Sequence, residues 1–134
     1  MLHMVAGLGA PRLRTAFDSA GLTGIRPAQA VALVPLAAGP LHASMLAERL
    51  GVTRQAVAQA IRALEPHGYV TRTRDPSDAR SLLIELTPRG RQALAVMRAN
   101  AIAIEADWLE ILGQRRLSDL RQTLQLLLSH RDFC

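Results

Sequence analysis

The stretch from residue 43 to residue 64 constrains the fold more than any other part of the chain. It reads ASMLAERLG and then VTRQAVAQAIRAL, two short amphipathic segments that meet at a glycine and a valine. We expect Gly51 to end the first helix in the left-handed conformation and Thr53 to cap the second. This spacing predicts a helix-turn-helix. The apolar side chains expected inside it are Met45, Leu46, Leu50 and Val52, the last filling the angle between the helices.

The second of these helices has two distinct faces. One carries an apolar stripe at helical spacing, made of Val57, Ala60, Ile61 and Leu64. The opposite face carries Arg54, Gln55, Ala58, Gln59 and Arg62. Guanidinium and amide groups bond the edges of guanine and adenine in a DNA major groove. The pattern therefore favours a DNA-reading helix, and an ordinary solvated helix face is the alternative.

A β-hairpin is predicted directly after these helices. YVTRTR and SLLIEL are short strand patterns on either side of a turn at residues 75–79, which opens with Asp-Pro. Three arginines surround this turn, Arg72, Arg74 and Arg80. We expect Asp78 to orient the guanidinium of Arg80 and so stiffen the tip. The alternative is a surface ion pair worth about 0–1 kcal/mol.

The rest of the chain is predicted to form further helices, with a loop at GLTGIRP and a turn at AGPLH. We expect helices over residues 11–20, 27–37 and 88–112, with Pro35 ending or kinking the second of them. Thr87 is placed to accept a hydrogen bond from the Gly90 N–H. A last helix over residues 117–130 is expected to be capped by Ser118. The apolar positions that step by three and four along the two final helices are Leu94, Met97, Ala101, Ile104, Trp108, Ile111, Leu117, Leu120, Leu124 and Leu127.

These elements predict a mainly α fold with a small β-hairpin wing, a winged helix-turn-helix. The 134 residues suggest one domain, 1–134. Within it we assign residues 38–90 to a DNA-binding lobe, and 1–25 and 91–134 to N- and C-terminal dimerisation helices. The long apolar seam is more than one chain of this size is expected to bury, so a homodimer is predicted.

The composition fits a nucleic-acid partner. The net charge is +5, and all 16 basic residues are arginine, whose planar fork suits phosphates and base edges. A composition bias towards arginine is the alternative. The chain's one cysteine, Cys134, cannot form an internal disulfide, which fits a cytoplasmic protein. No signal peptide and no run of about 18 apolar residues is present, so no membrane association is expected.

No pattern typical of an enzyme is found. The four histidines, His3, His42, His67 and His130, are scattered without metal-ligand spacing. Phosphate-binding loops, paired carboxylates and nucleophile motifs are absent from the sequence. We therefore expect no catalytic residues, no metal and no cofactor.

The segment LAERLGVTRQAVAQAIRALEPHGYVTRTRDPSDARSLLIELTPRG resembles the winged helix-turn-helix of MarR-type transcriptional regulators. The matching features are the LA..LGV helix, a helix led by threonine, L..HGYV.R, and a D.R motif followed by LT..G. A weaker resemblance extends from about Phe17 to Leu128. Pro66 departs from the pattern, because it is expected to end the recognition helix a turn early. The first helix also looks short, and it has no cysteine nearby of the kind that peroxide-sensing members carry.

The resemblance implies a homodimer that binds a pseudo-palindromic site on double-stranded DNA, typically as a repressor released by a small ligand or an oxidant. The DNA-binding residues that it implies, together with the faces described above, are Thr53, Arg54, Gln55, Gln59, Arg62, Arg72, Arg74, Asp78 and Arg80. The alternative is a winged-helix module that binds proteins without binding DNA. The sequence names no effector; the residues expected near a largely apolar pocket are Arg26, His42 and Trp108.

Overall fold

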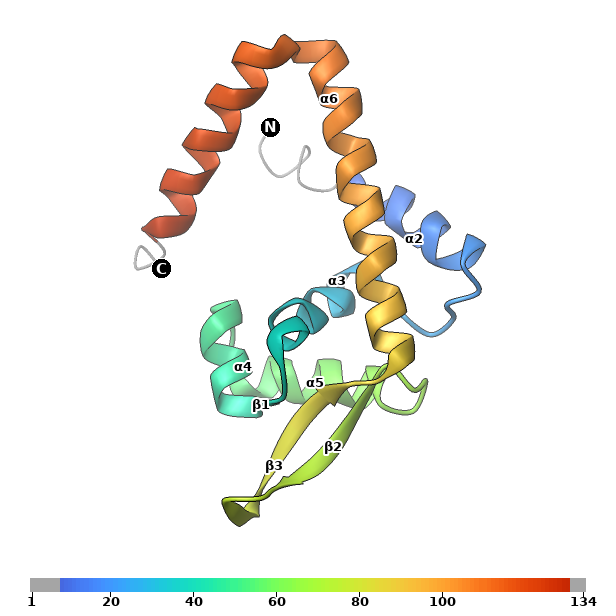
Figure 1. Ribbon diagram of the computed structural model, residues 1–134, viewed down its shortest axis with the longest axis vertical. Coiled ribbons are helices and arrows are strands. Elements are labelled where there is room, and N and C mark those ends of the chain that lie inside the picture. Colours follow the sequence, from blue (N-terminus) through green and yellow to red (C-terminus); the bar gives the residue numbers. More distant parts are fainter. Residues whose placement is uncertain (1–7, 131–134) are drawn as a thin grey trace. The chain divides into compact units, whose positions relative to one another are not determined.

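The computed structural model describes residues 8–130 (Figure 1). His3 and Cys134 lie outside this range. The chain forms two compact units that divide between Arg98 and Ala99, and each is described by itself. The division assigned from the sequence, with a lobe at 38–90 flanked by dimerisation segments, remains a prediction.

The first unit begins with a series of short helices. They are α2 (Gly9–Ser19), α3 (Pro27–Ala30), the 3₁₀ helix η1 (Val31–Ala38), α4 (Ala43–Leu50) and α5 (Arg54–Leu64). The helix predicted from residue 27 is present, but its second part is 3₁₀ and contains Pro35. Proline lacks the N–H that an α-helix interior requires, so the tighter form over this stretch agrees with the predicted interruption.

The turn between α4 and α5 has the expected backbone but not the expected side chains. Gly51 adopts the left-handed conformation with φ 67° and ψ 34°. The side chain of Val52, however, is 46% exposed and that of Met45 is 42% exposed, so their predicted inward orientation is wrong. Leu46 is buried as predicted, and Ala47 is buried beside it. Successive helical residues point about 100° apart, so burial of these two turns Met45 towards solvent.

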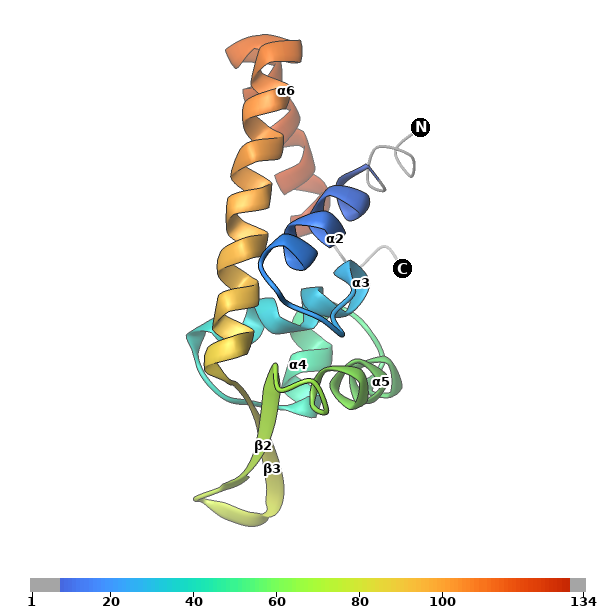
Figure 2. The ribbon, with the colours of Figure 1, turned by 90° about the vertical axis from the view of Figure 1, so that its right-hand side faces the viewer.

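The strands form one antiparallel sheet in the order β1–β3–β2. They are β1 (Leu41–His42), β2 (Val70–Asp75) and β3 (Asp78–Leu86). β1 was predicted to be part of a turn, which is wrong: its two residues pair with Ile84 and Leu83. A two-residue strand is too short to show alternation in the sequence. β3 begins three residues before the predicted strand, so the hairpin is longer than expected. In Figures 1 and 2 it extends away from α4 and α5.

One apolar core holds the first unit together. Its largest fully buried side chains are Tyr69, Phe17, Leu33, Leu36, Leu46, Leu64 and Val57. The Tyr69 hydroxyl donates a hydrogen bond to the backbone carbonyl of Thr23. Gly90 lies so close to Tyr69 that a Cβ at position 90 would be 2.2 Å from the Tyr69 carbonyl oxygen. Glycine at position 90 therefore allows the first turn of the next helix to approach β2.

That helix is α6 (Pro88–Ser129), which is interrupted at Gly113, where φ is 79° and ψ 165°. Thr87 caps its start as predicted, since its Oγ1 accepts from the Gly90 N–H at 3.1 Å. The helical conformation resumes directly after Gly113, so Ser118 lies inside the helix and its predicted capping role is wrong.

The second unit contains the part of α6 from Ala99 onwards. An ion pair joins Arg121 Nη2 to Glu105 Oε2 at 2.9 Å, across the interruption at Gly113. Leu117 is buried, but Ile111, a member of the predicted seam, is 77% exposed. Other large apolar side chains that are exposed in this unit are Ile102, Leu109, Leu126, Leu127 and Leu128. No helix among residues 8–130 combines the length and apolar character needed to cross a membrane.

Candidate nucleic-acid interface

Burial on one side fixes the orientation of α5. Val57, Ile61 and Leu64 are all buried in the core of the first unit. Thr53 caps the helix as predicted, because its Oγ1 accepts a hydrogen bond from the Ala56 N–H at 3.1 Å. The helix ends at Leu64, just before Pro66, as expected from a proline that interrupts it.

The opposite face of α5 is exposed along its whole length. Arg54, Gln55 and Gln59 all lie on this face. Arg62 is exposed as well, but its Nε donates to the Ala58 carbonyl oxygen at 3.2 Å, so the side chain follows its own helix. The face therefore presents one arginine and two amides, with a second arginine directed along the helix surface.

The three arginines of the hairpin have different surroundings. Arg72 forms an ion pair with Glu65, with 3.0 Å between Nε and Oε2. This pair joins β2 to the turn that follows α5, and both side chains remain partly exposed. Arg74 and Arg80 are exposed nearer the tip. Arg72 thus has a structural partner, whereas Arg74 and Arg80 present their charge to solvent.

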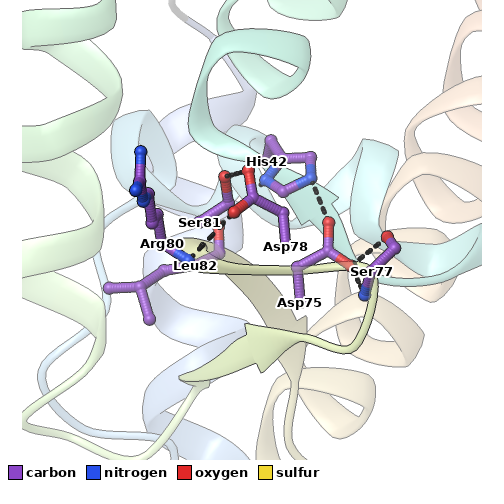
Figure 3. Close-up of polar contacts among 7 residues, drawn as sticks. All are labelled: His42, Asp75, Ser77, Asp78, Arg80, Ser81 and Leu82. Carbon is purple, nitrogen blue, oxygen red and sulfur yellow. Dashed lines mark hydrogen bonds and ion pairs between the residues drawn. The ribbon is translucent and has the colours of Figure 1, made fainter.

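Asp78 bonds the backbone rather than a guanidinium. Its Oδ1 accepts from the backbone N–H of Arg80, and its Oδ2 accepts from the Ser81 hydroxyl, both at 3.0 Å. Figure 3 shows the Arg80 guanidinium pointing away from this carboxylate. The expected contact between Asp78 and the guanidinium is therefore wrong. A short acidic side chain readily bonds the N–H two residues ahead, and this explains the spacing of the two residues.

Asp75 makes a second group of hydrogen bonds at the tip. Its Oδ1 accepts from the backbone N–H and the hydroxyl of Ser77, at 2.9 and 2.7 Å. Its Oδ2 lies 2.8 Å from Nε2 of His42, whose Nδ1 lies 3.2 Å from the Leu82 carbonyl oxygen. The two Ser77 hydrogen bonds are the main reason why the pKa of Asp75 lies below its ordinary 3.8, and His42 lowers it further.

His42 is the residue at this site that sequence reasoning missed. It was expected near an effector pocket, and it instead joins β1 to both strands of the hairpin (Figure 3). Its position depends on the pairing of β1 with β3, which the sequence does not predict. The sequence shows only that His42 comes immediately before the α4 helix, and this position does not indicate a partner.

Two clefts adjoin α5. One, of about 550 Å³, lies between α5 and the hairpin, with Val57, Ile61 and Ile84 among its apolar walls and Arg80 among its charged ones. The other, of about 980 Å³, is lined by Arg14, Asp18, Gly24, Ile25, Arg26, Gln29, Arg62, Ala63, Pro66 and His67. Trp108 belongs to the second unit and lines neither. Of the residues expected near a pocket, only Arg26 lines one of these clefts.

The arrangement is better suited to binding a polyanion than to catalysing a reaction. Amides and guanidinium groups lie on a fixed helix face, and further arginines lie on the adjacent hairpin. Guanidinium groups bond phosphate oxygens and base edges, and phosphate contacts supply much of the affinity of nucleic-acid binding. Within residues 8–130, no group of three or more His, Cys, Asp or Glu side chains could hold a metal ion.

Comparison with known proteins identifies relatives over most of the chain. The model of the MarR family matches residues 21–81, from the loop before α3 into β3. The HTH-type transcriptional repressor Rv2887 of Mycobacterium tuberculosis is 38% identical over 108 residues, which cover 80% of this chain and 74% of the repressor.

Solved structures show the same fold. A probable transcriptional regulator from Pseudomonas aeruginosa is 27% identical, with a TM-score of 0.71, over 95% of this chain and 96% of that one. FabT from Streptococcus pneumoniae, solved in complex with DNA, is 18% identical with a TM-score of 0.79. That match covers 96% of this chain and 90% of FabT. At this identity the FabT match shows the fold alone.

Proposed function

Because this chain belongs to the MarR family of transcriptional regulators, we propose that it is a sequence-specific repressor that binds double-stranded DNA. The observation that carries the proposal is the orientation of α5. Its buried stripe leaves Arg54, Gln55 and Gln59 exposed beside a hairpin that bears exposed arginines. The FabT structure in complex with DNA provides a related fold in a bound state.

In the proposed complex, α5 enters the major groove. Arg54 bonds guanine, and Gln55 and Gln59 bond adenine, as their donor and acceptor groups allow. Thr53 and Arg62, at the two ends of the helix, contact the backbone. Both are exposed, so the surrounding fold leaves them accessible.

The hairpin acts as the wing. Arg74 and Arg80 contact phosphates or a narrow minor groove, where the negative potential favours arginine. Arg72 contributes positive charge while its ion pair with Glu65 keeps β2 beside α5. Asp78 contributes indirectly, because it shapes the backbone that presents Arg80.

The operator is proposed to be pseudo-palindromic and to be bound by a homodimer. The exposed apolar side chains of the second unit, including Leu109, Ile111 and Leu126, support a second copy as their partner. Two recognition helices in successive major grooves require half-sites centred about 10–11 base pairs apart. The proposal includes a small-molecule effector that releases the DNA. It also includes a cytoplasmic location.

Selection of bound duplexes from a random pool tests this function. We expect enrichment of an inverted repeat, and an affinity that falls steeply as salt is raised. Sedimentation should give the mass of two chains. The double variant Arg54→Ala/Gln59→Ala should lose the sequence preference while it keeps its fold by circular dichroism. Enrichment of no sequence, or binding that does not depend on salt, would favour a protein-binding winged helix instead.

A further inference from the structure

We propose that His42 is a proton-dependent positioning residue of the wing. In its charged form the imidazole bonds both strands of the hairpin from β1, and loss of the proton breaks one of these bonds. The proposal rests on the proposed function, because its consequence is a change in DNA affinity with pH. It adds a pH-dependent input to the proposed DNA-binding site.

The geometry requires two donors on the ring. Nδ1 lies 3.2 Å from the Leu82 carbonyl oxygen, and Nε2 lies 2.8 Å from Oδ2 of Asp75 (Figure 3). A carbonyl oxygen only accepts hydrogen bonds, and so does an ionised carboxylate. Neutral imidazole has a single N–H, whereas the imidazolium ion has two. Both contacts are therefore satisfied only when His42 carries two ring protons.

Asp75 does not supply the second proton near neutral pH. Ser77 donates two hydrogen bonds to Oδ1 of Asp75, from its backbone N–H and its hydroxyl. These bonds favour the ionised form and keep the pKa of Asp75 below its ordinary 3.8. The proton between Asp75 and His42 therefore resides on Nε2 of the imidazole, and the carboxylate of Asp75 accepts it as a hydrogen bond.

Other charged groups lie on the elements around His42. Asp78 and Arg80 lie at the start of β3, and Glu48 and Arg49 lie in the last turn of α4. The carboxylate of Asp78 already accepts from Arg80 N–H and from a serine hydroxyl. Within the described part of the chain, the ion pair of His42 is with Asp75. One change of charge on the ring therefore acts mainly on that aspartate and on the Leu82 carbonyl.

These two bonds act where the wing is least regular. The pairing of β2 with β3 shifts between Arg74 and Asp75, next to the tip. Once the ring is neutral, a lone pair faces either the carboxylate or the carbonyl, and that contact becomes repulsive. The adjacent arginines, Arg74 and Arg80, are then less firmly positioned. Imidazole is the side chain whose charge changes most readily near neutral pH, so the ring is the group proposed to gain and lose the proton.

DNA affinity as a function of pH tests the proposal. The probe is a fluorescent duplex obtained by the selection described above, and the proteins are wild type, His42→Gln and His67→Gln. Wild-type affinity should weaken by about two- to fivefold between about pH 5.5 and 8, in keeping with an ion pair whose histidine is 40% exposed. His42→Gln keeps an N–H donor but does not titrate, so its profile should be flatter. His67→Gln, altered away from the wing, should follow wild type.

A second measurement needs no DNA. In NMR spectra of the free protein, the backbone amide signals of Asp75, Ser77 and Leu83 should shift with pH over the same range. They should not shift in His42→Gln, and in Asp75→Asn the shifts should be smaller. If these signals titrate equally in wild type and His42→Gln, the proposal is overturned.

The two measurements separate this proposal from the proposed function. Wing signals that titrate through His42 in a protein that binds no DNA would overturn the repressor function and leave the structural role of His42 intact. Salt-dependent DNA binding with the same pH profile in wild type and His42→Gln would overturn the role of His42 and leave the repressor function intact.

Discussion

The recognition helix and the wing both present arginines to solvent, but different forces position them. The helix α5 is oriented by Val57, Ile61 and Leu64, which are buried. The outer part of the wing has no such core, since Leu82 near its tip is 48% exposed. There the backbone conformation depends on hydrogen bonds to Asp75 and Asp78. Apolar burial thus fixes one arginine-bearing surface, and ionised carboxylates fix the other.

Because of this difference, the two surfaces should respond differently to a change in pH. Burial of apolar area depends little on pH, so the α5 face should be presented equally over a wide range. Hydrogen bonds to carboxylates and histidine depend on ionisation. We therefore expect the wing to be the adjustable part of the interface, and the helix the constant one.

The largest expected effect is from Ile61→Ala, which removes a buried side chain that orients α5. The free energy of unfolding should fall by about 2–5 kcal/mol, because a cavity is left in the core. Leu82→Ala on the wing should cost less than about 1 kcal/mol, since that side chain is already half exposed. Urea denaturation of both variants measures the contrast. Equal losses would contradict the distinction between the two regions.

The next effect concerns base recognition by the helix. Gln59→Ala should weaken binding to the preferred duplex by about 1–3 kcal/mol and relax the choice of base at one position. Its stability should change by less than about 0.5 kcal/mol, because the side chain is exposed. Competition assays with single-base variants of the operator provide the measurement. An equal loss on all duplexes would remove Gln59 from the base-reading set.

Arg80 on the wing should behave differently from Gln59. We expect Arg80→Ala to weaken binding to every duplex by a similar factor, and to lower the slope of log affinity against log salt by about one. Arg80→Lys is the matched control, because it keeps the charge and should keep most of the slope. A loss confined to one sequence would mean that Arg80 reads bases.

Asp78 tests how the wing positions that arginine. Asp78→Ala removes the acceptor for the Arg80 N–H and for the Ser81 hydroxyl, so binding should weaken by about two- to fivefold despite the gain of one net positive charge. Asp78→Asn keeps an acceptor oxygen and should retain more of the affinity. Tighter binding by both variants would show that Asp78 acts only by repelling phosphate.

The smallest effect is on acid stability. The lowered pKa of Asp75 means that its contribution to stability is complete above the ordinary value of 3.8. The contribution is lost as the pH falls through the lower pKa of the folded state. Ser77→Ala removes the largest cause of this shift, so stability should depend less on pH below about 3.8. Ser81→Ala, which alters a bond to Asp78 instead, is the control, and unfolding by urea at several acidic pH values gives the comparison.

The apolar pattern of the sequence was sufficient to predict the helix-turn-helix and its orientation. Val57, Ile61 and Leu64 recur at helical spacing, and Thr53 and Gly51 mark the ends of the two helices, as the structure confirms. The structure and its solved relatives confirm the fold, and the family match confirms a family of transcriptional regulators rather than enzymes. These features depend on local periodicity and capping, which a single sequence contains.

The wing network depends on contacts that a single sequence does not reveal. His42 meets Asp75 across 33 positions of the chain, through a strand of two residues. The sequence shows Asp78 two residues before Arg80, but it does not show that the carboxylate bonds the backbone N–H of Arg80 rather than its guanidinium. Met45 and Val52 are exposed because other apolar side chains, such as Leu46, occupy the core next to them. Such pairings are decided by tertiary structure and carry no periodic signal.

The position of β2 at the edge of the sheet has a further consequence. β3 lies between its two neighbours, so β2 has one row of backbone N–H and C=O groups without a strand partner. Such an edge can recruit a strand from another molecule and start aggregation. Arg74 on this strand and Arg80 on β3 present positive charge to solvent, so a second copy of the hairpin would bring like charges together. The arginines proposed to attract DNA thereby also protect the free protein from self-association through its wing.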